Sequence, residues 1–356
     1  MLNRSIIIAI VAGSLLIGGA ITTGIILSQK NRGQPDYYEE NAINVPDGNN
    51  TSCNSVNINT EQINVDTNGT TVSNTAGPTI LPACRAINIT NNTQVLIWQD
   101  EFDGEMVDTN KWMVIDWPGT TGYGNNELQT YHKDHVDVYN GAMHIMASRE
   151  GDEWLSGRVE SKQSWTPGMI FDNKVVTKIY FESSIHTPDS GNGLWPGFWF
   201  FPDEYVYGDY AASGEIDAME LRDSYDSITC GVHYGGPETG YDGISNLRNM
   251  TRTSNADGAS FSNKNLIFGV EWALDTIVFF VNGVEMTRRH SKAIDPVNGW
   301  FSAASNAKIS SPFDIPFKAI YNIAVGGNFP QHAPDENTPN EVMMSVDYFR
   351  VFADFA

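Results

Sequence analysis

The chain has 356 residues, of which 41% are hydrophobic and 11% aromatic, and its formal net charge is −22 at pH 7. This length can bury a large core, and an all-β sandwich of about 250 residues can still form one domain. The charge argues against nucleic acid and anionic polymers as partners, because the basic surface that would neutralise phosphates is absent. A neutral polymer suits this charge best.

The first long apolar stretch follows a short tail, residues 1–4. Ser5 to Ser28 contains no charged residue. It exceeds the roughly 7–15 residues of a signal-peptide core and matches the roughly 20 that span a bilayer. The pattern predicts a single transmembrane signal-anchor helix over residues 5–28. Cleavage as an atypical signal peptide is the alternative, and it would give a secreted protein.

Basic residues flank this helix on both sides, so the positive-inside rule leaves its orientation open. Glycosylation sequons beyond the helix favour a type II protein whose carboxy-terminal part is extracellular or lumenal. They start at Asn50, Asn68, Asn88, Asn91 and Asn249.

Residues 29–91 are rich in Asn, Thr, Gly and Ser and show no sustained periodicity. Such a composition buries too little apolar surface to offset the entropy of ordering, so we expect a disordered stalk. Cys53 and Cys84 could pair within this stalk, whereas Cys230, on an apolar strand, is expected to be a buried free thiol.

The rest of the chain, residues 92–356, reads as short alternating strands separated by Gly, Pro, Asn and Asp. Asn140-Gly141 predicts a hairpin turn within Val136 to Ser148, and Asn282-Gly283 repeats the pattern. Many strands without helical periodicity predict an all-β sandwich or jelly roll.

Three acids, Glu215, Asp217 and Glu220, stand within six residues of an otherwise apolar strand. Alternation puts Glu215 and Asp217 on one face and Glu220 on the other. One extra residue at Ala218-Met219, a β-bulge, would bring Glu220 to the same face.

A structural strand has no reason to keep three acids that repel one another. Retaining glycoside hydrolysis does, because it needs two carboxyl groups about 5–5.5 Å apart, one ionised and one protonated. Residues two pleats apart on an ideal strand are separated by about 13 Å, so the strand must bend and the two Glu side chains must lean together.

The motif E-I-D-x-x-E resembles the signature of glycoside hydrolase family 16, in its bulged, laminarinase-like branch. Further landmarks lie in the order expected for that family: WQDEFDG (98–104), GNNELQTY (124–131), SGRVESK (156–162), GLWPGFWFFP (193–202), GVHYGG (231–236), FGVEW (268–272), IAVGGNFP (323–330) and VDYFRVF (346–352).

The resemblance implies a two-sheet antiparallel, concanavalin A-like jelly roll with a concave substrate cleft. It also implies that Glu215 is the nucleophile, Asp217 the assisting acid and Glu220 the general acid/base.

Further positions matching the family imply contacts with sugar. Trp195 and Trp199 would stack on glucosyl units, while Asn126, Glu127 and Arg158 would line the cleft. For the neighbouring Asn125, a turn is the favoured interpretation. His233 would lie on the strand after the catalytic one, near Glu220.

No cofactor is required for this chemistry. Family members often hold a structural Ca²⁺, and Glu101, Gly141 and Asp347 match its ligand positions approximately. The three cysteines form no zinc-binding pattern.

The resulting prediction is a monomeric, membrane-tethered, retaining endo-β-1,3-glucanase acting on β-glucan. The alternatives are a β-glucan transglycosylase of wall remodelling, a non-catalytic β-glucan-binding protein, and a hydrolase of galactans. A sulfated galactan would be expected to select more Arg and Lys in the cleft than this acidic chain shows.

Overall fold

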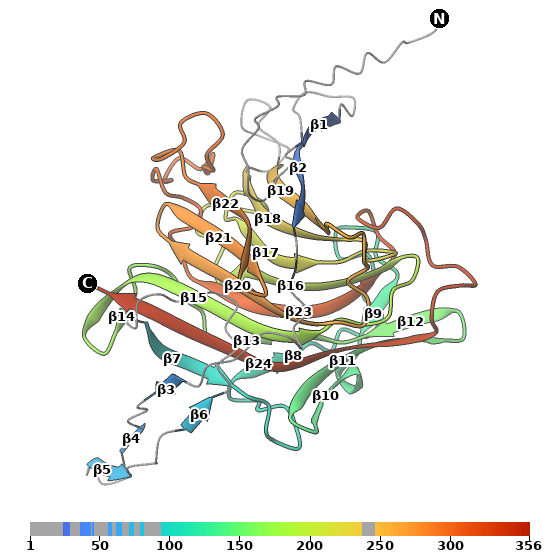
Figure 1. Cartoon of the computed structure of the whole chain (residues 1–356), viewed down its shortest axis with the longest axis horizontal. Helices are drawn as coiled ribbons and strands as arrows, with labels where there is room; N and C mark the ends of the chain where they lie inside the picture. The colour runs from blue at the N-terminus through green and yellow to red at the C-terminus, as the bar shows by residue number, and fades with distance from the viewer. Residues whose placement is uncertain are drawn as a thin grey trace, which may run out of the picture.

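Two large β-sheets make up most of the molecule (Figure 1). The computed structural model describes residues 24–28, 36–43, 45, 56–58, 62–65, 71–74, 79–81, 94–236 and 246–356. Among these, the helical element is one 3₁₀ turn, Lys133–His135. The predicted all-β, two-sheet architecture is therefore confirmed.

The first sheet has nine strands, in the order β1-β2-β19-β18-β17-β16-β23-β13-β8. Their bounds are β1 Gly24–Ser28, β2 Asp36–Ile43, β8 Trp112–Val114, β13 Arg158–Ser161, β16 Leu194–Pro202, β17 Glu215–Glu220, β18 Ser227–Gly235, β19 Asn246–Asn255 and β23 Phe317–Val325. The strand with the three acids, β17, thus lies at the middle of this sheet.

The second sheet has eleven strands, with the main order β22-β21-β20-β15-β24-β11-β12-β9 and with β10, β14 and β7 paired alongside. Their bounds are β7 Val95–Asp100, β9 Gln129–Tyr131, β10 Val136–Tyr139, β11 Ala142–Glu150, β12 Glu153–Ser156, β14 Ile170–Phe171, β15 Lys174–His186, β20 Asn265–Ala273, β21 Thr276–Val281, β22 Val284–His290 and β24 Glu341–Phe355. The pairs β3 (Val56–Ile58)–β6 (Thr79–Leu81) and β4 (Gln62–Val65)–β5 (Thr71–Asn74) stand apart.

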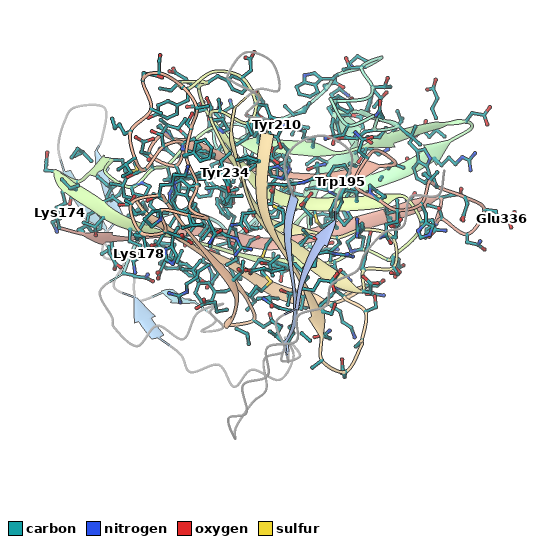
Figure 2. All side chains as sticks on the ribbon, turned by 90° about the horizontal axis from the view of Figure 1, so that it is seen from above. Lys174, Lys178, Trp195, Tyr210, Tyr234 and Glu336 are labelled. Atoms are coloured by element: carbon teal, nitrogen blue, oxygen red, sulfur yellow. The ribbon has the colours of Figure 1, made fainter. Side chains whose placement is uncertain are left out.

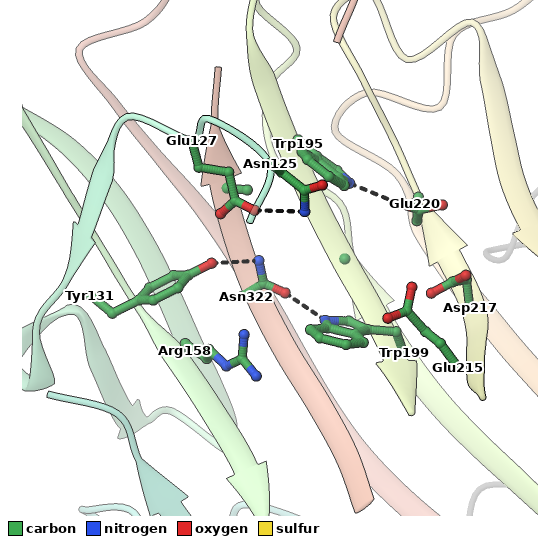
Figure 3. Close-up of a pocket in the computed structure, with 12 residues that line it drawn as sticks. Asn125, Glu127, Tyr131, Arg158, Trp195, Trp199, Glu215, Asp217, Glu220 and Asn322 are labelled. Atoms are coloured by element: carbon green, nitrogen blue, oxygen red, sulfur yellow. Dashed lines mark hydrogen bonds between the residues drawn. The ribbon is translucent and has the colours of Figure 1, made fainter. Parts of the chain in front are cut away.

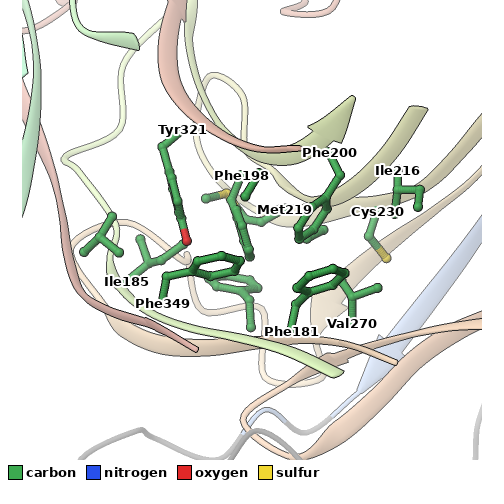
Figure 4. Packing of buried hydrophobic residues seen from close by; sticks show 14 of the residues in the cluster. Phe181, Ile185, Phe198, Phe200, Ile216, Met219, Cys230, Val270, Tyr321 and Phe349 are labelled. Carbon is green, nitrogen blue, oxygen red and sulfur yellow. The ribbon is translucent and has the colours of Figure 1, made fainter. Parts of the chain in front are cut away.

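An aromatic layer between the two sheets forms the core (Figure 4). Phe198 of β16 stacks on Tyr321 of β23, with ring centroids 4.6 Å apart, and Phe200 of β16 meets Phe181 of β15 at 4.4 Å. Alternation along β16 sends Phe198 and Phe200 into this layer, so Trp195 and Trp199 face the opposite side of the first sheet. The core thereby fixes which side chains of β16 are available for binding.

Both predicted hairpins are confirmed. β10 pairs with β11 around Asn140-Gly141, and β21 pairs with β22 around Asn282-Gly283. All four turn residues have positive φ, between 46° and 80°, which is the backbone geometry that makes Asn-Gly the preferred two-residue turn.

The predicted transmembrane helix, residues 5–28, lies largely outside the described residues. Its last five residues form strand β1, which pairs antiparallel with β2, so the helix prediction is wrong there. A physical reason is the run of β-branched residues around Ile25 and Ile26, which favour extended backbone. None of the described residues belongs to a helix long and apolar enough to cross a bilayer.

The predicted stalk, residues 29–91, contains ordered strands and is not disordered throughout. β2 pairs in parallel with β19 over residues 37–43, and Ile43 packs against the core. Composition failed to reveal this strand because β2 gains backbone hydrogen bonds from an existing sheet edge and needs little apolar surface of its own. Cys53 and Cys84 lie outside the described residues, while Cys230 is a buried free thiol as predicted.

Glu39 of β2 provides a carboxylate partner for a buried arginine. Arg289 of β22 is 6% exposed, and its Nη1 lies 3.3 Å from Glu39 Oε2. The same guanidinium donates from Nε to the carbonyl of Asn249 and from Nη2 to the hydroxyl of Thr251. A buried charge left without its counter-ion is costly, so β2 is expected to be an integral part of the domain.

Glu39→Gln should lower the free energy of unfolding by about 1 kcal/mol, because Arg289 loses its charge partner while Glu39 itself is partly solvated. Urea unfolding monitored by tryptophan fluorescence would measure the change. The control is Glu40→Gln, since Glu40 is half exposed and 3.8 Å from Arg252. That change should stay within about 0.5 kcal/mol. Equal effects of the two substitutions would contradict an integral role for Glu39.

Candidate active site

A bulge in β17 brings the three acids to one face of the first sheet. Trp199 of β16 pairs with Asp217, and the next pair is Phe198 with Met219, so Ala218 is the extra residue. The pairing with β18 shifts over the same stretch, between Asp217 and Glu220. The predicted bulge is confirmed, and all three acids line one pocket (Figure 3).

This pocket is built by several strands of the first sheet, by the loop that leads into β9, and by the end of β9 itself. Its volume is about 410 Å³, including the part open to solvent. The lining residues are Asn125, Glu127, Tyr131, Arg158, Trp195, Gly197, Trp199, Glu215, Asp217, Glu220, Asn322 and Ala324. In Figure 2, Trp195 and Tyr210 lie towards the middle of the molecule, between Lys174 at one end and Glu336 at the other.

Burial dominates the electrostatics of the acids. It raises the pKa of both Glu215 and Glu220 well above the usual range, and the negative charge of Asp217 raises both further. Arg158 opposes the rise in the pKa of Glu215. The cluster therefore keeps a proton at a pH where exposed glutamates have lost theirs.

Trp195 holds Glu220 through a hydrogen bond from its indole Nε1 to Oε1, at 3.0 Å. Phe329, on the loop after β23, packs against the Trp195 ring with centroids 5.0 Å apart. Arg222, two residues after Glu220, donates to the Phe329 carbonyl at 2.8 Å and lies over its ring. This packing fixes the indole that orients the carboxyl group.

A second chain of contacts fixes Trp199. Its Nε1 donates to Asn322 Oδ1 at 2.7 Å, and Asn322 Nδ2 donates to the hydroxyl of Tyr131 at 2.9 Å. The guanidinium of Arg158 lies 5.0 Å from the Trp199 ring centroid. Its Nη2 donates to Glu160 Oε1 at 2.7 Å, and this ion pair orients the guanidinium. Trp199 is thus a half-buried, preorganised surface beside the acids and not a core side chain.

His233 lies at the Glu215 end of the row, not near Glu220 as expected. It pairs across the strands with Glu215, and its Nε2 is 3.3 Å from Asp217 Oδ2 and 3.6 Å from Glu215 Oε1. The expectation failed because the antiparallel register between β17 and β18, which no local pattern shows, places His233 opposite Glu215 and Thr229 opposite Glu220. Tyr210 contacts the other ring nitrogen, Nδ1, at 2.8 Å.

The loop before β9 contributes two residues to the pocket, but not the expected pair. Glu127 is 8% exposed and accepts hydrogen bonds from Asn125 and Gln129, while burial raises its pKa. Asn125 lines the pocket, whereas the favoured interpretation was a turn. Asn126 has a positive φ of 59° and donates to Asn328 Oδ1. It is not among the residues that line this pocket, and its contact with sugar stays a prediction.

Tyr131, Asn322, Tyr210 and Gly197 belong to the site but were not singled out from the sequence. A signal existed for Gly197, which lies between two cleft tryptophans. A Cβ there would come within 3.3 Å of the Trp199 ring and 3.4 Å of Asn322 Oδ1, so the position has little room for a larger residue. The others depend on contacts between distant strands, which no local pattern encodes.

Two of the three predicted calcium ligands, Glu101 and Asp347, have other partners in the structure. Both carboxylate oxygens of Glu101 accept from the Arg350 guanidinium, at 2.7 and 2.8 Å, and Asp347 accepts from Ser184. Gly141 occupies a hairpin turn with positive φ. A carboxylate neutralised by arginine is a poor cation ligand, so Glu101 does not fit this role well, and the calcium site stays a prediction.

Comparisons with known proteins agree with this geometry, although no protein-family model matches the chain. Glucan endo-1,3-beta-glucosidase A1 of Niallia circulans is 31% identical over 283 residues, which are 73% of this chain but only 38% of that protein. The glucan endo-1,3-beta-glucosidase of Cryptopygus antarcticus is 32% identical over 248 residues, 66% of this chain and 82% of that one. The solved endo-beta-1,3-glucanase of Pyrococcus furiosus is 28% identical, with a TM-score of 0.59 over 74% of this chain and 95% of that one.

Trp195→Phe should raise the pKa of Glu220 further, because the substitution removes the indole hydrogen bond that stabilises the ionised carboxylate. A ¹³C-NMR titration of labelled glutamate carboxyls would follow it. Trp199→Phe is the matched control, because the Trp199 indole donates to Asn322 and not to Glu220. This variant should leave the pKa of Glu220 unchanged. A downward shift in Trp195→Phe, or equal shifts in both variants, would contradict the assigned role of the indole.

Proposed function

The chain belongs to glycoside hydrolase family 16, in its laminarinase-like branch, and on this basis we propose that it is a retaining endo-β-1,3-glucanase. One observation carries the proposal: the extra residue in β17 brings Glu215 and Glu220 into one pocket, with Asp217 between them. Two carboxyl groups flanking a glycosidic bond are the machinery of this reaction. The relatives named as endo-1,3-glucanases support β-1,3 as the linkage that is cleaved.

The proposed reaction is a double displacement. The Glu215 carboxylate attacks the anomeric carbon of a β-glucan, and Glu220 gives its proton to the departing oxygen as the glycosidic bond breaks. Water then attacks the same carbon, returns a proton to Glu220 and releases the Glu215 carboxylate. Two inversions leave the anomeric configuration unchanged.

The electrostatics of the pocket supply the proton that this reaction needs. Burial and the charge of Asp217 raise the pKa of both Glu215 and Glu220, so the cluster keeps a proton for a general acid to donate. The assignment of nucleophile and acid to the two glutamates is proposed from the family motif. The Trp195 indole holds Glu220 by one oxygen, leaving the other to face the substrate.

The substrate is proposed to lie across the first sheet, over Trp195 and Trp199, whose half-buried rings offer flat apolar surfaces for glucosyl units. Arg158, Glu127 and Asn125 would supply hydrogen bonds to sugar hydroxyls beside them. A neutral glucan also suits the net charge of −22, because an anionic polysaccharide would be repelled.

We also propose that the enzyme works outside the cytoplasm, as expected for polymeric glucan. Of the sequons, Asn249 lies in β19 and is half-buried, and the others fall outside the described residues. Peptide mapping of glycans on the protein expressed in a eukaryotic host would test the proposed location.

Incubation of the full chain with laminarin, mixed-linkage glucan, cellulose and agarose should yield short oligomers from laminarin, with retained configuration at the new reducing ends by ¹H NMR. Products longer than the starting chains would establish a transglycosylase instead. No product from laminarin in the presence of a folded protein would contradict the proposed function.

Glu215→Gln should abolish turnover of laminarin, and Glu220→Gln should slow it by roughly 10²–10⁴-fold, the usual contribution of general acid–base catalysis. A dinitrophenyl β-glucoside oligomer separates the two roles, because its leaving group departs without protonation. Glu220→Gln should still release a burst of dinitrophenol, whereas Glu215→Gln should release none. A burst from Glu215→Gln alone would reverse the assignment.

A further inference from the structure

Glu215, Asp217 and His233 form a compact group of potential metal ligands. One oxygen or nitrogen of each lies within 4.8 Å of the others. His233 Nε2 is 3.3 Å from Asp217 Oδ2 and 3.6 Å from Glu215 Oε1. The three side chains come from adjacent strands, β17 and β18, at the middle of the first sheet, so the sheet holds them in place.

Asp217 Oδ2 provides a second, independent observation. Asp217 is only 2% exposed, yet this oxygen accepts no hydrogen bond from any residue that the structure describes. A buried carboxylate oxygen normally has a donor, because desolvation without one is costly. Its neighbour within 3.3 Å is His233 Nε2, without the geometry of a hydrogen bond. The buried oxygen thus lies beside His233 without a donor, in the group whose ligand atoms are within 4.8 Å of one another.

We propose that this group is a binding site for one zinc ion, held by Glu215, Asp217 and His233. Zinc takes carboxylate and imidazole ligands at about 2.0–2.2 Å in tetrahedral geometry, which places two ligand atoms about 3.3–3.6 Å apart. The two distances from His233 Nε2 already lie in this range.

Tyr210 completes the site from behind His233. A metal-bound histidine usually donates its second ring N–H to an oxygen that fixes the tautomer and the ring plane. The Tyr210 hydroxyl lies 2.8 Å from His233 Nδ1. With Nδ1–H donating to this hydroxyl, the Nε2 lone pair points towards the two carboxylates.

The ligand set selects zinc over calcium and magnesium. A single imidazole with two carboxylates suits zinc, whereas calcium takes six to eight oxygen ligands and magnesium demands an octahedral shell. The positive charge of Arg158, which acts on Glu215, moderates the affinity for a cation. The site is therefore expected to bind zinc reversibly.

Binding has a consequence that rests on the proposed function. Glu215 and Asp217 line the substrate pocket, so the fourth coordination position of the ion faces the sugar. A coordinated Glu215 cannot attack the anomeric carbon. Zinc should then inhibit hydrolysis in competition with the glucan, and a chelator should restore it.

Isothermal titration calorimetry of the full chain with zinc chloride tests the site directly. We expect one equivalent of zinc to bind to the unaltered protein. Zinc should bind at least about 10-fold more weakly to His233→Gln, which loses a ligand, and about 10-fold more weakly to Tyr210→Phe, which keeps every ligand. His332→Gln is the matched control, because His332 is an exposed histidine 3.6 Å from the carboxylate of Asp223. It should bind zinc as the unaltered protein does, and calcium chloride should give no heat at this site.

Absence of a one-equivalent event, or equal loss in His233→Gln and His332→Gln, would overturn the proposal. Circular dichroism checks that His233→Gln is folded; if it is not, Tyr210→Phe alone decides the outcome. Because calorimetry needs no turnover, a protein that binds zinc without cleaving laminarin would refute the proposed function and leave the site standing. Cleavage without zinc binding would do the reverse.

Discussion

The period of a β-strand is the constraint on which the site depends. Side chains alternate strictly between faces, so Glu215 and Glu220 cannot share a face unless one residue is added between them. Ala218 is that residue, and the pairing of β17 with both neighbouring strands shifts by one residue there. Ile216 and Met219 keep their places in the aromatic core while the acids reach the pocket. Packing and chemistry are satisfied on opposite faces by the same six residues.

Residues whose positions follow from local patterns could be predicted from the sequence. The bulge and the two Asn-Gly hairpins follow from alternation and turn chemistry, while Trp195 and Trp199 were placed in the cleft by the family resemblance. Tyr131 and Asn322 could not be found this way, because 191 residues separate the partners of their hydrogen bond. The position of His233 was misjudged for a related reason, since the register that places it opposite Glu215 is a contact between two strands.

Composition was a weaker guide than alternation. The segment before the sandwich is rich in Asn, Thr, Gly and Ser, and disorder was expected, yet Asp36–Ile43 is a strand. Its partners are backbone groups of β19 and the buried guanidinium of Arg289, and neither contributes to a count of hydrophobic residues. Apolar content predicts whether a segment can form its own core, but not whether it can attach to an existing one.

Strand β2 also changes what the domain presents to its neighbours. Without it, the backbone donors and acceptors of β19 would form a bare sheet edge ten residues long, open to pairing with another copy of the chain. A recombinant domain that starts at the sandwich proper, near residue 92, would carry that edge. Its tendency to self-associate in concentrated solution would then reflect the truncation, and a fragment beginning before Asp36 would be the sounder choice for crystals.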